Sequence, residues 1–338
     1  MDSAGADTVS VVIPCYNGMP YLPQAVGSAL EQTHRPCQII VVDDGSKDDS
    51  AAVVEKLAAE HPARGIELIR QANAGEPAAR NTGIHHATGE WVAMLDTDDW
   101  WEPTKLEKQL AAAAATGPDC VMVHTGWVHH FPDGRAEPKN LEAPGRRVGR
   151  CTAALLEPTS IGHPSIMVHR EALERIDGYD ESFRQSCDID LYFRLSAIGS
   201  FAFVPEHLLH YRIHPGQMSA SQADQVPFHH RAVRSFFERH PDLAREIGPQ
   251  RIEAGLAQHV ALKLESLWWR RRLVDFRKLL AYAREQGLNS AEIRRWRRRA
   301  WWPHWLVHLR DRFSGGTAGK AADTRKGTTG AAAEEAPE

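Results

Sequence analysis

The chain has 338 residues, of which 42% are hydrophobic and 25% charged, as in ordinary soluble globular proteins. A formal net charge of −4 argues against nucleic-acid binding through bulk charge. Its five cysteines include no Cys-x-x-Cys pair, which argues against a zinc site or a disulfide framework and favours a reducing compartment. The N-terminus lacks the pattern of a secretory signal, and no apolar run of about 18 residues predicts a membrane span. We expect a cytoplasmic protein, or one peripheral on the cytosolic face of a membrane.

The first third of the chain alternates short apolar runs with segments of helical spacing. Strands are predicted at 9–13, 38–42, 66–69 and 90–95, and helices at 21–32, 49–60 and 77–87. Strands that alternate with helices, and that are continuously apolar, indicate a mostly parallel sheet flanked by helices. The predicted class is therefore an α/β fold.

Further helices and strands are predicted after residue 100. We expect a helix from Pro103 to about residue 115, a strand at 120–128 and a loop or hairpin at 130–150. Strands at 165–168 and 201–204 flank a helix at 189–198. From about residue 226 helical patterning dominates, so the predicted organisation is an α/β domain at 7–225, a helical C-terminal region at 226–313 and a disordered tail at 314–338.

Polar side chains gather where four of the predicted strands end. The segments are Pro14 to Asn17, Asp43 to Ser46, Asn73 to Gly83 and Asp96 to Asp99. In an open parallel sheet, ligands bind beyond the carboxyl ends of the strands. The sequence therefore predicts one binding site at this edge of the sheet.

The acidic segment Asp96-Thr97-Asp98-Asp99 directly follows an apolar strand. Carboxylates spaced in this way can share a hard divalent cation such as Mg²⁺ or Mn²⁺. Such an ion would neutralise charge on a leaving diphosphate. The alternative is that Asp98 or Asp99 caps the following helix, which explains one aspartate rather than three.

The segment Asp43-Asp44-Gly45-Ser46 has two equally supported interpretations. Its acids can accept hydrogen bonds from a base or a ribose hydroxyl, with Gly45 allowing the turn to approach the ligand closely. Equally, Asp, Gly and Ser are ordinary turn and helix-capping residues.

Taken in order, these segments resemble the sequence blocks of glycosyltransferase family 2. The resemblance is strong over about residues 8–110, traceable to about 220 and absent beyond. It rests on Val9 to Asn17, Ala29 to Thr33, Ile40 to Ser46, Asn73 to Gly83, Thr88 to Glu90 and Met94 to Asp99. It implies a GT-A fold, a nucleotide-diphosphate-sugar donor, with a UDP-sugar favoured, and inversion at the anomeric carbon.

The resemblance also implies roles for single residues. Asp43 would orient the turn, Arg80 would lie near the base or diphosphate, and Asp98 would be the surer metal ligand, with Asp96 and His214 as further ones. The alternatives are an exposed helical position for Arg80 and a structural role for His214. The nucleotide-sugar-binding set is Pro14, Tyr16, Asn17, Asp43, Asp44, Arg80, Asp96 and Asp98.

An inverting displacement needs a carboxylate that takes the proton of the acceptor hydroxyl. The family usually shows Glu-Asp before an apolar helix, and the matching run places Asp188 at the base position, with Cys187 in place of the glutamate. The alternative is that Asp188 caps the helix and Asp190 is its first-turn acid. Cys187 is not expected to be a nucleophile, since inversion needs no covalent intermediate.

Three later segments also resemble the family, at Gly178 to Phe183, at His210 to Ser219 and at His163 to Arg170. In the second, Arg212 or His214 would contact the diphosphate or the metal. His163, in a third such segment, and His210 are weaker candidates. The histidine pairs at 85–86, 129–130 and 229–230 are expected on the surface.

The segment Ile293 to Phe313 combines seven arginines and four tryptophans with one acid. This mixture suits the surface of an anionic membrane. An equally supported alternative is a helical subdomain whose tryptophans pack on the rest of the protein. No nucleic-acid partner is expected, because no nucleic-acid-binding fold accompanies the mixture.

Together these features predict an inverting, metal-dependent glycosyltransferase. Its acceptor would be the hydroxyl of a growing glycan or lipid-linked saccharide in cell-surface polysaccharide or glycoconjugate synthesis. One competing interpretation is a nucleotidyltransferase, although the first strand end, Pro14 to Asn17, is not a basic Gly-rich loop. Another is a sugar-nucleotide or membrane-surface binding protein of weak or no activity.

Overall fold

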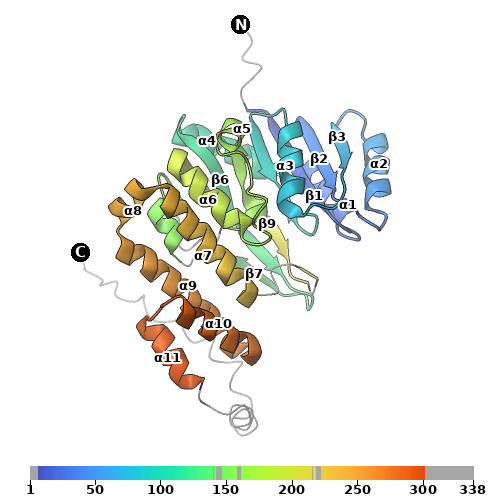
Figure 1. Ribbon diagram of the computed structural model, residues 1–338. Helices are drawn as coiled ribbons and strands as arrows, with labels where there is room; N and C mark the ends of the chain where they lie inside the picture. Colours follow the sequence, from blue (N-terminus) through green and yellow to red (C-terminus); the bar gives the residue numbers. More distant parts are fainter. Residues whose placement is uncertain are drawn as a thin grey trace, which may run out of the picture.

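The computed structural model describes residues 7–139, 141, 147–157, 161–214, 216–217 and 222–300. Over these residues the chain forms one nine-stranded sheet with helices on both faces, followed by a group of C-terminal helices (Figure 1). The predicted α/β class with a helical C-terminal addition is confirmed. The predicted disordered tail lies outside the described residues.

The strands are β1 (Val9–Cys15), β2 (Gln38–Asp43), β3 (Ile66–Arg70), β4 (Trp91–Met94), β5 (Trp100–Trp101), β6 (Cys120–His130), β7 (Ala136–Lys139), β8 (Met167–His169) and β9 (Ser200–Arg212). The helices are α1 (Leu22–Leu30), α2 (Ser50–Glu60), α3 (Glu76–His86), α4 (Lys105–Thr116), α5 (Arg170–Arg175), α6 (Cys187–Ile198), α7 (Gln222–Arg239), α8 (Pro241–Ile247), α9 (Pro249–Trp269), α10 (Leu273–Glu285) and α11 (Ala291–Arg299). Short 3₁₀ turns, η2 and η3, cover Thr152–Leu156 and His163–Ser165.

The sheet order is β3-β2-β1-β4-β8-β6-β9-β5, with β7 paired to β6. Strands β3, β2, β1 and β4 are parallel, as predicted, and so are β6 and β9. The three-residue β8 runs antiparallel to both β4 and β6. Strand β5 pairs antiparallel with β9, and β7 pairs antiparallel with β6. The parallel strands therefore form the half of the sheet that carries the first polar strand ends, while the other half is mixed.

Alternation along the central strands builds a core on each face of the sheet. In β1, Val11 and Ile13 pack toward α1 and α4, whereas Val12 packs toward α3 and α6. All three side chains are fully buried, and each such burial contributes about 1.5–3 kcal/mol. The two hydrophobic layers fix the sheet edge on which the polar segments lie.

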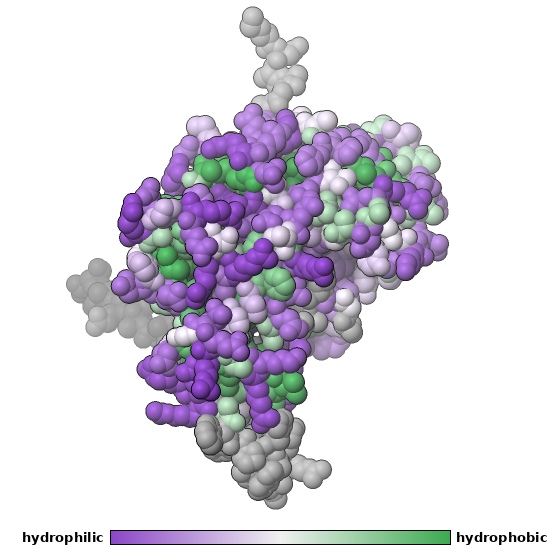
Figure 2. Space-filling view, in the orientation of Figure 1, coloured by the Kyte–Doolittle hydropathy of each residue, from purple (hydrophilic) through white to green (hydrophobic). Residues whose placement is uncertain are grey.

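The C-terminal helices have a third hydrophobic core. Phe236, Leu264, Phe276 and Trp296 are buried in it, and Phe193 of α6 joins them with its ring 5.2 Å from that of Phe236. This contact docks the helices on the sheet-bearing part of the molecule (Figure 1). On the visible face, hydrophilic residues cover most of these helices (Figure 2).

Several boundaries differ from the sequence expectations. The helix expected from Pro103 begins at Lys105 with Thr104 as its N-cap residue, so neither Asp98 nor Asp99 caps it. The strand expected at 165–168 is shorter and follows a 3₁₀ turn, because Pro164 sits in the first turn of η3. No described helix is long and apolar enough to cross a membrane.

The histidine pairs were expected on the surface, and only one pair is fully there. His85 and His86 are exposed, whereas His129 and His130 on β6 are half-buried. His230 is buried in the helical core, where its Nδ1 lies 3.0 Å from the hydroxyl of Tyr282. The expectation was wrong for these pairs because β6 and α7 are covered by neighbouring elements.

Candidate active site

One large cleft runs past the ends of β1, β2 and β4, the first turns of α3 and α6, and one side of α9. Its volume is about 1610 Å³, larger than the roughly 300–1,000 Å³ of an ordinary small-molecule site. Almost the whole predicted set lines it, and Asp43 is the exception. The predicted residues in its wall are Pro14, Tyr16, Asn17, Asp44, Arg80, Asp96, Asp98, Asp188 and His214.

The loop after β1 is tied to the loop after β2. Asn17 adopts a left-handed conformation with φ of 51°, and its Oδ1 accepts a hydrogen bond of 2.8 Å from the amide of Lys47. The amide of Asn17 donates to Ser46 Oγ at 2.9 Å. These bonds leave Tyr16 51% exposed in the cleft wall, with its ring available for stacking against a planar base.

The two acids after β2 have different tasks. Asp43 is buried, and its Oδ1 accepts from the amide of Ser46 at 2.8 Å, so it holds the turn as the sequence suggested. Asp44 accepts from the amides of Ala74 and Gly75, each at 2.8 Å. Its third bond, also 2.8 Å, comes from Gln71 Nε2. A carboxylate has about four acceptor positions, so Asp44 retains one for a ligand.

Arg80 is 2% exposed, so the alternative of an exposed helical arginine is wrong. Its guanidinium donates to Asp96 Oδ1 at 2.7 Å, forms an ion pair with Glu76, and lies over the ring of Tyr179. Burial raises the pKa of Asp96, and the guanidinium of Arg80 opposes that rise. Arg80 thus links the helix α3 to the acids after β4.

Glu76 is a functional candidate that the sequence reasoning missed. It is the first residue of α3 and lines the cleft. Burial raises its pKa to about 7, Arg80 lowers it, and the charges of Asp96 and Asp188 raise it further. A signal existed, because an acid directly follows the Asn73-Ala74-Gly75 segment at a predicted strand end.

The acids after β4 form a cluster. Asp96, Asp98 and Asp99 each offer a carboxylate oxygen, and these atoms lie within 4.8 Å of one another. His214 Nε2 lies 2.9 Å from Asp98 Oδ2. Carboxylate oxygens suit Mg²⁺ or Mn²⁺, so the three acids fit such an ion. Asp99, which the sequence placed in this acidic segment and also offered as a helix cap, belongs to this group.

The segment after β9 closes over the acid cluster through backbone and side-chain contacts. The amide of Arg212 donates to Asp99 Oδ1 at 2.8 Å, and Arg212 Nε donates to the carbonyl of Asp98 at 3.0 Å. Its guanidinium lies over the rings of Tyr21 and Trp100. Of the two candidates in this segment, Arg212 therefore holds the loop in place, while His214 reaches the acids.

Asp188 is the second residue of α6, whose N-cap is Ser186 in a left-handed conformation. Asp188 is therefore not the helix cap, although Asp190 lies in the first turn as that alternative expected. Burial raises the pKa of Asp188, and Arg80 is among the groups that lower it. Cys187 is buried beside it, and burial also raises the pKa of that thiol, which disfavours the nucleophilic thiolate.

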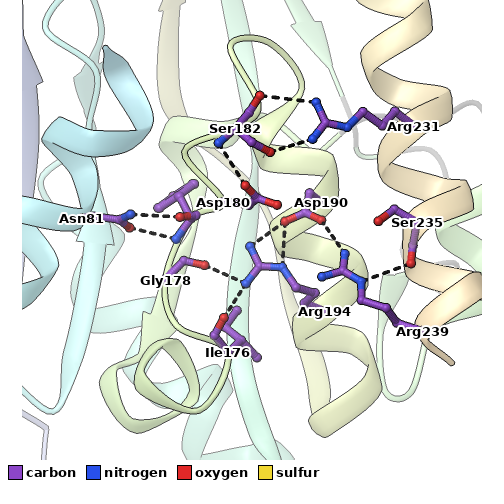
Figure 3. Close-up of polar contacts among 11 residues, drawn as sticks. Asn81, Ile176, Gly178, Asp180, Ser182, Asp190, Arg194, Arg231, Ser235 and Arg239 are labelled. Carbon is purple, nitrogen blue, oxygen red and sulfur yellow. Dashed lines mark hydrogen bonds and ion pairs between the residues drawn. The ribbon is translucent and has the colours of Figure 1, made fainter. Parts of the chain in front are cut away.

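Helix α6 is anchored by a buried ion-pair network (Figure 3). Asp190 is fully buried, accepts from Arg194 Nε at 2.7 Å and pairs with Arg239 of α7 at 3.3 Å. Arg194 also donates to the carbonyls of Ile176 and Gly178 at 2.6 and 2.7 Å. The network joins α6, α7 and the loop that precedes α6.

Asn81 of α3 clamps the same loop (Figure 3). Its Nδ2 donates to the carbonyl of Tyr179 at 2.9 Å, and its Oδ1 accepts from the amide of Tyr179 at 2.8 Å. Gly178 has φ of +61°, and a Cβ there would lie 2.5 Å from Asn81 Oδ1. The helix that carries Arg80 is therefore fixed to the segment that carries Asp188.

The two weaker histidine candidates lie in different places. His163 lies in the cleft wall but is buried between the hydroxyls of Tyr179 and Tyr192, each 2.8 Å from a ring nitrogen. Burial lowers its pKa, so it is a neutral structural link. His210 stacks on Trp100 and lies 2.8 Å from Glu102, outside the cleft lining.

Comparisons with known proteins indicate the family of this chain. The family described as glycosyl transferase family 2 matches residues 10–177. An uncharacterized glycosyltransferase of Nostoc sp. is 33% identical over 230 residues, which cover 64% of this chain and 68% of the relative. A putative teichuronic acid biosynthesis glycosyltransferase of Bacillus subtilis is 31% identical over 216 residues, which cover 63% of this chain and 82% of the relative. Chondroitin synthase of Escherichia coli is 28% identical and covers 68% and 33%.

Solved structures share the fold. S. aureus TarS has a TM-score of 0.55 at 18% identity and covers 75% of this chain and 43% of its own. TarS 1–349 in complex with UDP-GlcNAc has a TM-score of 0.54 at 17% identity and covers 83% and 92%. At such identities the likeness concerns the fold alone. The family match, the relatives and the arrangement of the cleft lead to one conclusion: the chain belongs to glycosyl transferase family 2 and is a glycosyltransferase.

Proposed function

We propose that this glycosyltransferase moves a sugar, with inversion, from a UDP-sugar to the hydroxyl of a growing glycan or lipid-linked saccharide. The observation that carries the proposal is that Asp188 and the acids Asp96 and Asp98 line one cleft large enough for a donor and an acceptor. Relatives named for chondroitin synthesis and teichuronic acid biosynthesis support an acceptor in polysaccharide synthesis.

The donor's nucleoside would bind at the ends of β1 and β2. Tyr16 offers an exposed ring for the base, and Asp44 offers its remaining acceptor position to an N–H or hydroxyl donor. The complex of TarS with UDP-GlcNAc supports uracil as the base, since that protein shares the fold. The diphosphate would then extend toward the acids after β4.

Asp96, Asp98, Asp99 and His214 would hold a Mg²⁺ or Mn²⁺ ion. When bound, such an ion neutralises the negative charge of the departing nucleoside diphosphate. Arg80 keeps one oxygen of Asp96 engaged, and the Arg212 amide keeps one oxygen of Asp99 engaged. The chain thereby orients the remaining oxygens of both acids.

Asp188 would act as the base. Its carboxylate takes the proton of the acceptor hydroxyl while the acceptor oxygen bonds to the anomeric carbon and the bond to the diphosphate oxygen breaks. An α-linked donor gives a β-linked product. Burial raises the pKa of Asp188, which strengthens it as a base near neutral pH.

A donor screen by thermal shift tests the donor site, because a ligand that binds only the native state stabilises it. UDP-, GDP- and dTDP-sugars are compared with and without Mn²⁺, on wild type and on Asp98→Asn. The proposal expects a shift with the UDP-sugar that depends on Mn²⁺ and is lost in Asp98→Asn. Asp119→Asn, at an exposed residue of an ion pair, is the control. No shift with any donor would refute the donor site.

A membrane surface remains a proposed partner only through part of the Arg/Trp segment. Ile293 and Trp296 are buried in the helical core, where the ring of Trp296 lies 5.9 Å from that of Trp268. These two residues therefore pack inside the protein, as the alternative to membrane binding expected. The tryptophans at 301, 302 and 305 lie outside the described residues. We propose that residues beyond 300 contact an anionic membrane when the acceptor is lipid-linked.

A further inference from the structure

One side of α9 carries a cationic stripe that faces the cleft. His259, Lys263, Ser266 and Arg270 follow each other at intervals of four, three and four residues, which places them on one helix face. All four line the same cleft as Asp96, Asp98 and Asp188. The cleft is therefore acidic where the sheet ends and basic where α9 passes.

The charges on this stripe have no acidic partner in the part of the chain that the structure describes. Among the described residues, no carboxylate forms an ion pair with Lys263 or Arg270. Burial lowers the pKa of Lys263, and the charge of Arg270 lowers it further, so the two cations repel each other. Of the carboxylates in the lining, Glu137 pairs with Lys139 at 3.0 Å and Glu157 with Arg251 at 3.9 Å. An anion in this part of the cleft would relieve the repulsion.

Two neutral histidines extend the same wall. His229 of α7 lies against His259, with ring centroids 3.9 Å apart, and both line the cleft. Burial lowers the pKa of His229 to about 3 and also lowers that of His259. At neutral pH each ring is uncharged and has one N–H donor for an anionic or hydroxyl oxygen.

Aromatic rings form another part of the cleft wall. Trp127, His129 and Phe131 of the β6–β7 hairpin and Tyr211 of β9 line the cleft. Apolar ring faces beside polar and charged groups suit an elongated ligand that is part ring and part oxyanion. This combination favours a saccharide over a simple ion.

We propose that the α9 stripe is an acceptor subsite for an acidic saccharide, with Lys263 and Arg270 binding a carboxylate or phosphate of a sugar unit. The inference rests on the proposed function, because it assigns the acceptor class of the same cleft. The donor sugar lies at the acidic end beside Asp96 and Asp98, and the acceptor chain extends from Asp188 toward α9.

Matched pairs of oligosaccharides test the inference. Oligouronates are compared with their methyl esters, and phosphorylated oligosaccharides with their phosphate dimethyl esters, because both kinds of ester keep the sugar skeleton and remove the charge. Calorimetric titration of the full chain, with UDP and Mn²⁺ present, should show wild type binding an acidic member at least about tenfold tighter than its ester. In Lys263→Ala/Arg270→Ala this preference should fall to about twofold or less. Lys278→Ala, at an exposed lysine of α10, should keep it.

Equal binding of acid and ester by wild type, or no binding of any acidic member, overturns the inference. So does a preference that survives in the double variant, provided that its circular dichroism and melting temperature match wild type. The donor shift of wild type with Mn²⁺ separates this result from the proposed function. A donor shift without any acid preference refutes the acceptor class alone, whereas its absence refutes the donor site.

Discussion

At the scale of single residues, Asp98 and His214 meet across the cleft at 2.9 Å, although 116 positions separate them in the sequence. If they share an ion, Asp98→Asn and His214→Ala should both weaken donor binding in Mn²⁺, the first by about tenfold or more, since a carboxylate contributes charge as well as a ligand atom. Donor titrations with and without Mn²⁺ measure this. Equal affinity in both conditions for wild type would contradict the metal site.

Glu76 predicts a pH dependence of stability. Desolvation of its carboxyl group in the cleft wall raises its pKa from the ordinary 4.5 to about 7, against the lowering effect of Arg80. Between these values the native protein holds a proton that the unfolded chain has released, so stability is greatest at the acid end and is lost as the pH rises. The free energy of unfolding of wild type should therefore fall by about 2 kcal/mol between pH 5 and 7. In Glu76→Gln this fall should be absent.

Urea unfolding at pH 5, 6 and 7 checks this prediction, with Glu60→Gln at an exposed helical position as the control. Parallel curves for wild type and Glu76→Gln would show that Glu76 is ionised in the native state across this range.

At the scale of elements, α6 owes its position to the Asp190 network. Arg194→Ala removes two carbonyl contacts and leaves Asp190, which is fully buried, with Arg239 alone. A buried ion pair that loses one partner costs about 3–5 kcal/mol. We expect a loss of this order by chemical denaturation, together with a lower kcat, since Asp188 sits on the same helix.

The control is Arg245→Ala, which breaks an exposed ion pair with Asp242 on α8. Exposed pairs contribute at most about 1 kcal/mol, so this variant should be close to wild type. Similar losses in both variants would mean that the Asp190 network does not hold α6.

The helical layer should be sensitive to acid. Burial lowers the pKa of His230 to about 4, so above pH 6.5 it is neutral in both states, and below it the unfolded chain gains a proton that the native state excludes. Stability is therefore lost as the pH falls from about 6.5. At pH 5 the free energy of unfolding that wild type loses should be smaller by about 2 kcal/mol in His230→Asn. A substitution at the exposed His85, His85→Asn, should leave the loss unchanged. Melting curves at pH 7 and pH 5 decide between them.

Element prediction from the sequence worked where the pattern was local. The parallel strands at 9–13 and 38–42 and the helix at 49–60 follow from continuous apolar runs and helical spacing. The short antiparallel β8 was placed two residues early, because three residues carry no period and Pro164 extends a turn into the run. Similarly, β9 runs to Arg212 rather than 204, since its second half pairs with β6 and β5 through long-range contacts.

At the scale of the whole molecule, the site followed from topology. Parallel strands bring their carboxyl ends to one edge, so the polar segments after β1, β2 and β4 had to meet there. Glu76, Asp99 and the α9 stripe did not follow. Their positions depend on how α3 packs, on the Arg212 backbone and on the docking of α9, and none of these has a short-range sequence signal.

The membrane proposal also belongs to this scale. A chain that ends at Ala300 retains Ile293 and Trp296, which are buried in the helical core, and removes the rest of the Arg/Trp segment. Full-length protein should float with liposomes that contain anionic lipid, while the shortened chain should float at least about fivefold less. Neither chain should float with neutral liposomes. Equal flotation of both chains with anionic liposomes would refute a membrane contact beyond residue 300.

The central claim is that Asp188 accepts the proton of the acceptor hydroxyl, while other residues of the same cleft bind the donor. Single-turnover transfer to the best acceptor of the saccharide panel, measured beside donor titration, tests it most directly. The account predicts that Asp188→Asn binds the donor within about threefold of wild type and transfers at least about 100-fold more slowly. Transfer at the wild-type rate by a correctly folded Asp188→Asn variant would contradict it.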